Sequence, residues 1–454
     1  MADFDLERER RMLERLRADY ADLRVSEGLA TDVTVKDGKL DEVTQNRVWY
    51  AGIRCLVNGA WGFAVTSRPE RLAESAQHAL RLARLGRGDV RLSEERVWQR
   101  KVTIKEKKRD NWDIDRKAKF CLELDRATRV SPRIKNVNIS LYGSSRTRTF
   151  VSSEGAAVEQ TEPSLHCIIM AVAESGGVRA EDFEHMGGRG GLEFLKNAED
   201  IAARVGRRAV GGLKAVAAPG GVMPVVVDSD MAGTLAHEAV GHGCEGDTVQ
   251  AGGSALAGMI GKQISAESIT IFDDPTMTGK NGYYVFDDEG VKARRTVLVQ
   301  DGILAAYLHS RSSAAWAGAS STGHGRAQSA TEPPIVRMSN TGIATGDMSA
   351  DEMFEGIKRG VYVEGARGGQ VLTKIGEFVF TAMRAWLIER GRLTSRLRDV
   401  TLSGNILETL KNVEGVGGRS VYGPSTCGKG AQSVPVTAGG PVVRFSAARV
   451  GGQA

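Results

Sequence analysis

Cysteine, histidine and long apolar runs are scarce in this sequence. Its 454 residues include five cysteines and seven histidines. An odd number of cysteines without short spacings indicates a reducing compartment and excludes a disulfide framework. No apolar run approaches the ~18 residues of a membrane-spanning helix, and the N-terminus is charged, unlike a signal peptide. We therefore expect a cytoplasmic protein with no membrane association.

A concentrated charge of one sign is also missing. The net charge of +5 is small for this length, whereas nucleic-acid binding normally needs a dense basic face. Residues 91–117 hold ten basic and six acidic side chains, an excess of 10 − 6 = 4, but only Trp98 and Trp112 accompany them. This pattern favours a solvated surface over a nucleic-acid site. The glycine-rich segment 187–191 lacks a Walker or Rossmann spacing, so no nucleotide site is predicted.

The remaining 41% apolar and 26% charged residues are ordinary for a globular protein. Their periodicity predicts an α+β fold in three parts. Residues 1–85 form a small α+β domain, with a helix over 4–23, hairpin strands and a second helix over 69–85. After a polar linker at 86–110, residues 110–217 form a central α+β domain in which helices at 113–130 and 192–210 flank hairpin-like strands. Residues 221–454 are rich in strands and glycine, which predicts a large, barrel-like C-terminal domain.

The candidate chemistry lies at residues 237–242, His-Glu-Ala-Val-Gly-His, after a predicted buried strand at 223–227. Zinc helices usually have the form H-E-x-x-H, because residues four apart lie on one helix face. Here the spacing is five, which places the two imidazoles roughly 140° apart on a regular helix. A π-bulge near Gly241 would bring His242 back beneath His237. The alternative is two structural histidines near a helix end, one exposed and one packed.

Further blocks of sequence follow in a fixed order. They lie at residues 272–276 (Phe-Asp-Asp-Pro-Thr), 286–290 (Phe-Asp-Asp-Glu-Gly), 301–302 (Asp-Gly), 321–325 (Ser-Thr-Gly-His-Gly) and 425–436, which contains Cys427-Gly428-Lys429-Gly430. Together with segment 237–247 they closely resemble the TldD subunit of the TldD/PmbA family of zinc metalloproteases. Residues 51–63 are similar to the first domain of that family. The resemblance therefore extends over nearly the whole chain.

The resemblance implies a site in which His237, His242 and Cys427 bind Zn²⁺ tetrahedrally and leave a fourth position for water. Glu238 is then the general base that takes a proton from that water and passes it to the leaving amine. The chain departs from the family at Ser425, which stands where a glycine is often found. Without zinc, Glu238 is a simple surface acid.

Other polar side chains near these motifs have weaker roles open to them. Cys244 or Glu245 is the alternative third ligand, and Asp247 is either an acceptor for a histidine N–H or a turn residue. His309 and His324 are expected to be structural, and the alternative is a part in the oxyanion site. Lys429 is expected to be exposed, and the alternative is that it lowers the pKa of the Cys427 thiol.

The resemblance also implies substrates and a partner. Small or unfolded peptides, including leader peptides of modified peptide products, are the expected substrates, held against an exposed strand edge. A heterodimer with a TldE/PmbA-type homologous subunit is expected, with a homodimer as the alternative. Two other functions remain open: a non-catalytic regulatory or nucleic-acid-associated protein, and a metal-dependent hydrolase of non-peptide amides.

Overall fold

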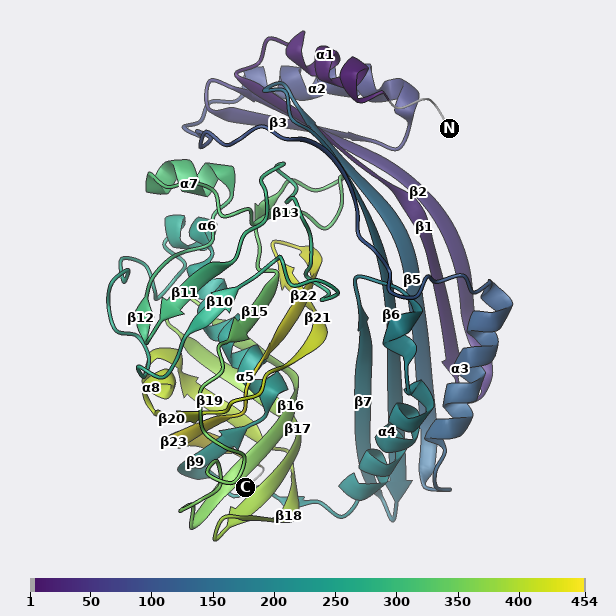
Figure 1. The fold of residues 1–454 in the computed structure, drawn as a ribbon, viewed down its shortest axis with the longest axis vertical. Coiled ribbons are helices and arrows are strands. Elements are labelled where there is room, and N and C mark those ends of the chain that lie inside the picture. The colour runs from purple at the N-terminus through teal and green to yellow at the C-terminus, as the bar shows by residue number, and fades with distance from the viewer. Residues whose placement is uncertain (1–4, 453–454) are drawn as a thin grey trace.

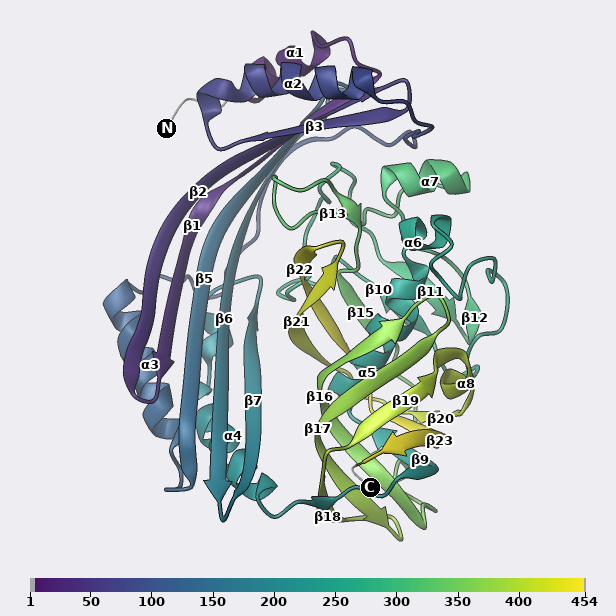
Figure 2. The same ribbon diagram turned by 180° about the vertical axis from the view of Figure 1, so that it is seen from behind.

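The computed structural model describes residues 5–452. A long, curved sheet arches around a strand-rich C-terminal domain (Figure 1), and the view from behind shows the same arrangement (Figure 2). Within the described range no helix combines the length and apolarity that crossing a membrane requires.

The curved sheet has seven strands in the order β3-β2-β1-β5-β6-β4, with β7 paired to β6. Two of its turns are two-residue hairpins: Asp37-Gly38 and Asn58-Gly59 all take positive φ, which a type I′ turn requires. The strands are β1 (Tyr20–Lys36), β2 (Lys39–Val57), β3 (Ala60–Thr66), β4 (Gln99–Thr103), β5 (Ile134–Ser152), β6 (Ala157–Ser175) and β7 (Val178–Gly188).

Helices cover the curved sheet at its two ends. At one end α1 (Leu6–Glu14) and α2 (Leu72–Leu85) pack on a core that includes Ile53, and at the other α3 (Ile114–Thr128) and α4 (Ala198–Gly212) pack on a core that includes Leu141. The sheet runs through both predicted N-terminal domains, so their division into residues 1–85 and 110–217 stays a prediction.

Two expectations about this half of the chain are wrong. The helix expected over 4–23 ends at Glu14, because Arg17 takes a left-handed φ of 52° and the apolar side chains from Tyr20 onward belong to strand β1. The polar segment 86–110 is not solely a linker. Its residues Gln99–Thr103 form β4, which pairs in parallel with β6.

The C-terminal domain contains a closed five-stranded barrel, because β16, β9, β23, β19 and β17 pair in sequence and β17 pairs back to β16. This confirms the α+β class with a barrel-like C-terminal domain. The barrel strands are β9 (Gly221–Val227), β16 (Arg359–Leu372), β17 (Glu377–Glu389), β19 (Thr401–Asn405) and β23 (Val443–Gly451), and β8 (Val216–Ala217), β18 (Arg392–Arg398) and β20 (Val413–Val416) extend the sheet.

A second, six-stranded sheet lies beside the barrel in the order β12-β11-β10-β15-β22-β21. Its strands are β10 (Ile271–Asp273), β11 (Thr296–Gln300), β12 (Ile303–Leu304), β15 (Asn340–Ile343), β21 (Val421–Lys429) and β22 (Gln432–Gly440), and β13 (Gly325–Arg326) pairs with β14 (Ile335–Val336). The short helices are α5 (Ser229–Leu235), α6 (Gly246–Gln250), α7 (Arg311–Ala317) and α8 (Ile406–Lys411). Helix α5 contacts both sheets, and it leads directly into segment 237–242.

Candidate metal centre

Helix α5 starts where strand β9 leaves the barrel. Asp228 caps it by accepting a hydrogen bond from the Met231 N–H. Met231 and Leu235 are buried on the face toward the core. A Cβ on Gly233 would lie closer than 3.0 Å to the backbone of Gly439, so the helix packs directly on β22. This contact fixes the position of the residues that follow.

The next turn of the helix is widened. Residues Ala236–Gly241 form a π-helix, and the His242 N–H donates to the carbonyl oxygen of His237, five residues back. The predicted π-bulge is therefore confirmed. A Cβ on Gly241 would lie closer than 3.0 Å to the sulfur of Met338, which is fully buried. A glycine is needed there because the core leaves no room for a side chain.

The widened turn brings both histidines to Cys427 on strand β21. One ligand atom from each of His237, His242 and Cys427 lies within 4.8 Å of the other two, and the separation of Cys427 Sγ from His242 Nε2 is 3.4 Å. A tetrahedral zinc ion with ordinary bond lengths holds a sulfur and a nitrogen about 3.5 Å apart. The donor set and its spacing therefore fit Zn²⁺. In residues 5–452 no other group of histidine, cysteine and acidic side chains converges in this way.

The electrostatic surroundings favour a thiolate at Cys427. Burial opposes ionisation of the Cys427 thiol, but electrostatic interactions and hydrogen bonds with His237 and His242 outweigh it and lower the thiol pKa to about 4. Burial also works against charging His242, yet the Glu245 carboxylate and Cys427 raise its pKa well above the ordinary value. A thiolate is thus the stable form of Cys427, and thiolates are the form that binds metal.

The alternative ligands lie elsewhere. Cys244 is fully buried in the hydrophobic core, and burial raises the pKa of its thiol. Glu245 accepts from His242 Nδ1 at 2.9 Å and so holds the side of the ring that faces away from Cys427. Lys429 binds Glu245 at 3.2 Å and Asp247 at 2.6 Å. Asp247 therefore orients a lysine and does not accept from a histidine.

The two remaining histidine candidates belong to buried hydrogen-bond networks. His309 Nδ1 lies 3.1 Å from the hydroxyl of Ser313, and His324 Nε2 lies 2.9 Å from Asp273 Oδ1. His324 is completely buried. Neither residue lines the cavity described below.

Two residues that support the ligands carry no signal in the sequence. Arg337, whose side chain is wholly buried, donates to the carbonyl oxygen of Cys427 at 2.6 Å and anchors the strand that carries the thiol. Thr341 lies with its hydroxyl 3.3 Å from His237 Nδ1. Both are far from the ligands along the chain, and only the folded sheet brings them near.

Glu238 lies between the three proposed ligands and an open cavity. Its Oε2 is 3.8 Å from His242 Nε2, and 30% of its side chain is exposed. It lines a cavity of about 730 Å³ together with His237. A carboxylate that borders both the ligand set and open space can accept a proton from a bound water.

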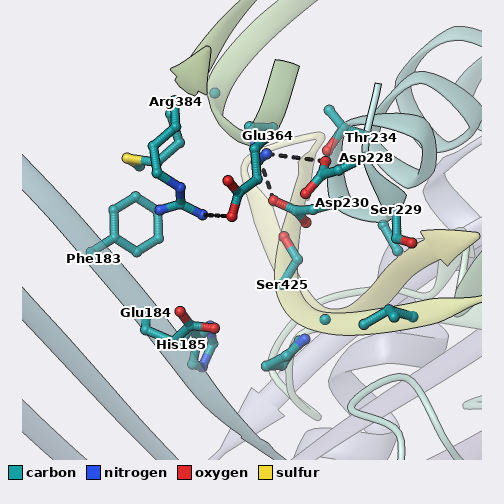
Figure 3. Close-up of a pocket in the computed structure, with 18 of the residues that line it drawn as sticks. Phe183, Glu184, His185, Asp228, Ser229, Asp230, Thr234, Glu364, Arg384 and Ser425 are labelled. Atoms are coloured by element: carbon teal, nitrogen blue, oxygen red, sulfur yellow. Dashed lines mark hydrogen bonds and ion pairs between the residues drawn. The ribbon is translucent and has the colours of Figure 1, made fainter. Parts of the chain in front are cut away.

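The cavity lies between the curved sheet and the C-terminal domain. Figure 3 shows Phe183, Glu184 and His185 of β7 on one side and Asp228, Asp230 and Ser425 on the other. Ion pairs join the two walls: Arg208 of α4 binds Glu184 at 2.9 Å and Glu364 of β16 at 3.1 Å, and Arg384 of β17 binds the buried Asp182 at 2.9 Å. Sequence reasoning missed these wall residues because they come from three separate regions.

Comparisons with known proteins agree with the fold and identify the family. Three family models match the chain: PmbA/TldA metallopeptidase domain 1 at residues 21–83, the central domain at 107–213 and the C-terminal domain at 220–452. The TldE crystal structure from Thermococcus kodakarensis has the same fold, with a TM-score of 0.80 and 21% identity, over 98% of this chain and 99% of that one.

Relatives in sequence are metalloproteases. The chain is 40% identical to a metalloprotease of Methanothermobacter thermautotrophicus over 439 residues, which is 96% of each protein. It is 35% identical to the metalloprotease TldD homolog of Haemophilus influenzae, over 72% of this chain and 70% of that protein. It is 29% identical to the zinc metalloprotease TldD homolog of Saccharolobus solfataricus, over 97% and 98%. The chain therefore belongs to the PmbA/TldD family of metallopeptidases, hydrolases that depend on a metal ion.

Proposed function

We propose that the chain is a TldD-type zinc peptidase in which His237, His242 and Cys427 bind Zn²⁺ and Glu238 is the general base. The observation that carries the proposal is the convergence of the three ligand atoms within 4.8 Å, at the wall of a cavity that Glu238 also lines. Three protein ligands leave the fourth tetrahedral position open for water, as in catalytic zinc sites.

Zinc bound there supplies a Lewis acid that polarises the scissile carbonyl and lowers the pKa of a water at the open position. The carboxylate of Glu238 accepts a proton from the attacking water and later donates it to the leaving amine. That carboxylate lies close to the ligand set, since its Oε2 is 3.8 Å from His242 Nε2. His242 is held in place by the hydrogen bond that it donates to Glu245, and the strand of Cys427 by the one that it accepts from Arg337.

The proposed substrates are small or unfolded peptides, including leader peptides of modified peptides. The cavity of about 730 Å³ is in the range that holds a drug-sized ligand, so a short extended segment fits and a folded domain does not. Strand β21 is an edge strand of its sheet. Thr426 is paired with Pro435 of the neighbouring strand β22, and a proline has no N–H to donate to the paired strand.

The backbone N–H and C=O of Thr426 consequently point toward the free edge, one residue before the proposed ligand Cys427. An extended peptide can add to that edge through main-chain hydrogen bonds, with little demand on its side chains.

A heterodimer with a TldE/PmbA-type homologous subunit is the proposed assembly, with a homodimer as the alternative. The likeness to TldE of Thermococcus kodakarensis supports a shared fold between the two kinds of subunit. The cytoplasmic location stays a prediction.

Elemental analysis combined with a peptide-cleavage assay tests the proposal. We expect about one zinc per wild-type chain, as a single site with three protein ligands requires, and strong loss of zinc in His242→Ala and in Cys427→Ala. Cys244→Ala is the matched control, because this cysteine lies in the core and is expected to leave the metal in place. Undiminished zinc in Cys427→Ala would show that the ligand set is wrong. Cleavage of small amides with none of unstructured peptides would show that the substrate class is wrong.

A further inference from the structure

A chain of buried hydrogen bonds leads away from His237. Its Nδ1 lies 3.3 Å from the hydroxyl oxygen of Thr341, and that hydroxyl donates to Asp273 Oδ2 at 2.8 Å. Asp273 Oδ1 in turn lies 2.9 Å from His324 Nε2. All four side chains are buried, and Thr341, Asp273 and His324 have no exposed surface. The chain crosses from the π-helix through β15 to β10.

The donors and acceptors in this series of hydrogen bonds determine which nitrogen of His237 carries a proton. The Asp273 carboxylate only accepts, and it receives bonds from the Ser339 N–H, the Ser339 hydroxyl and the Thr341 hydroxyl. Burial opposes its ionisation, but His324 and Ser339 outweigh burial and keep the pKa of Asp273 below its usual value. Thr341 has a single hydroxyl proton, and it donates that proton in the hydrogen bond to Asp273. The Thr341 oxygen is then an acceptor for His237, so Nδ1 of His237 carries the hydrogen.

With the hydrogen on Nδ1, Nε2 is the ring nitrogen of His237 that has a lone pair for a metal ion. His242 has the same tautomer when a metal displaces its Nε2 proton, since its Nδ1 donates to Glu245 Oε2 at 2.9 Å and its Nε2 faces Cys427. Metal-binding histidines usually donate their second N–H to a carboxylate, a carbonyl or water, which fixes the ring and raises its basicity. Here His242 donates directly to the Glu245 carboxylate, whereas His237 is linked to the Asp273 carboxylate through the hydroxyl of Thr341.

We propose that Thr341 and Asp273 are positioning residues for the metal, which fix the tautomer and orientation of His237 so that its Nε2 faces the ion. This inference rests on the proposed function, because it takes His237 to be a ligand. Neither residue touches the reacting atoms; both act through the imidazole. Their effect is therefore on how tightly and with what geometry the metal is held.

Asp273 also joins β10 to β15 through Ser339, so substituting it disturbs the sheet as well as the relay. Thr341 separates the two roles. Thr341→Val keeps the shape and removes the hydroxyl, whereas Thr341→Ser keeps the hydroxyl. Thr341→Ala removes the hydroxyl without adding a methyl group in a buried site. Ser339→Ala is the matched control, because it removes a different hydrogen bond to Asp273 and leaves the path to His237 intact.

The experiment measures the zinc dissociation constant by competition with a chromogenic chelator, and the visible absorption spectrum of the cobalt-substituted protein. We expect Thr341→Val and Thr341→Ala to bind zinc about 10–100-fold more weakly than the wild type, with an altered cobalt spectrum. Thr341→Ser and Ser339→Ala are expected to match the wild type in both readouts. Thermal unfolding of the metal-free variants shows which of them fold.

The result that overturns the inference is wild-type zinc affinity and an unchanged cobalt spectrum in a folded Thr341→Val or Thr341→Ala. Equal weakening in Thr341→Ser overturns it too, since the hydroxyl is then irrelevant. His242→Ala distinguishes these results from failure of the proposed function. If His242→Ala loses zinc while Thr341→Val does not, the metal centre stands and the relay is wrong; if His242→Ala keeps zinc, the metal centre itself is wrong.

Discussion

Replacing Gly241 with alanine tests the link between the π-helix and the metal centre. A Cβ at this position would lie closer than 3.0 Å to Met338 Sδ, 3.1 Å from its Cε and 3.4 Å from its Cγ. Ordinary contacts between such atoms are about 3.5–4.0 Å. Met338 is fully buried in the C-terminal core, so it has little room to move aside. The turn that carries both histidines must shift instead.

The expected loss of stability follows from two opposing effects. Adding a methyl group to a filled core costs about 1–3 kcal/mol. Alanine in place of glycine within a helix returns at most about 1 kcal/mol. The steric cost outweighs the gain in helix propensity, so we expect Gly241→Ala to lower the free energy of unfolding by up to about 2 kcal/mol. Since a shift of about 1 Å at a catalytic group costs about 100-fold in rate, peptide cleavage should fall by that factor or more.

A double-mutant cycle with Met338→Ala isolates the contact. Met338→Ala alone removes a buried side chain and costs about 2–5 kcal/mol. In that background the added methyl group has space, so Gly241→Ala should cost nothing further, and the coupling energy should fall in the range of about 1–3 kcal/mol for residues in contact. Urea unfolding of the metal-free wild type, the two single variants and the double variant measures the four free energies of unfolding, and the zinc content of each protein is measured as well.

Gly428 supplies the control. It is the residue after Cys427, and a Cβ there meets nothing within 4 Å. Gly428→Ala should therefore change stability by no more than about 0.5 kcal/mol, as surface substitutions do, and keep zinc. Additive costs for Gly241→Ala and Met338→Ala, together with full zinc binding in Gly241→Ala, would refute the argument that this glycine makes the widened turn possible.

Three further predictions follow from the structure. Glu238→Gln should retain zinc but cleave an unstructured peptide about 10²–10⁴-fold more slowly; an unchanged rate at full zinc content would contradict its role as base. Removing zinc with a chelator should lower Tm reversibly, since free zinc at 100 times its Kd stabilises by about 2.7 kcal/mol; a Tm that ignores both chelator and added zinc would count against a metal in the fold. Burial opposes ionisation of Glu162, but Arg148 and Arg189 outweigh it and lower its pKa from an ordinary 4.5 to about 2. Because the folded pKa is the lower one, this stabilisation of about 3 kcal/mol is present above pH 4.5 and is lost as the pH falls toward 2. Urea unfolding from pH 7 to pH 3 should show this loss in the wild type and not in Glu162→Gln, and parallel curves would contradict it.

Local periodicity predicted those elements whose apolar pattern and turn residues agree. The hairpins at Asp37-Gly38 and Asn58-Gly59 need positive φ, and the sequence offers residues that adopt it. The N-terminal helix was predicted too long because Leu16 and Tyr20 continue its apolar spacing. Both side chains are buried, but Leu16 belongs to the turn after α1 and Tyr20 to strand β1. A buried side chain every few residues does not by itself reveal where a helix gives way to a strand.

The candidate metal centre likewise has a part that local sequence predicts and a part that it does not. The spacing of His237 and His242 is local, so the sequence alone predicts a widened turn. Cys427 is 185 residues beyond His242, and only the family resemblance connects it to the histidines. Nothing in the sequence points to Thr341 or Arg337, since their roles arise from the pairing of β15, β22 and β21.

The first half of the chain provides a wall for the centre and none of its proposed ligands. His237, His242 and Cys427 all lie in the C-terminal domain, whereas Phe183, Glu184 and His185 of β7 line the cavity that His237 also lines. Ion pairs from Arg208 and Arg384 join the two sides, and Asp182 is fully buried within them. A buried ion pair that loses one partner costs about 3–5 kcal/mol. The curved sheet is thus held firmly against the metal domain, and its position limits what can reach Glu238.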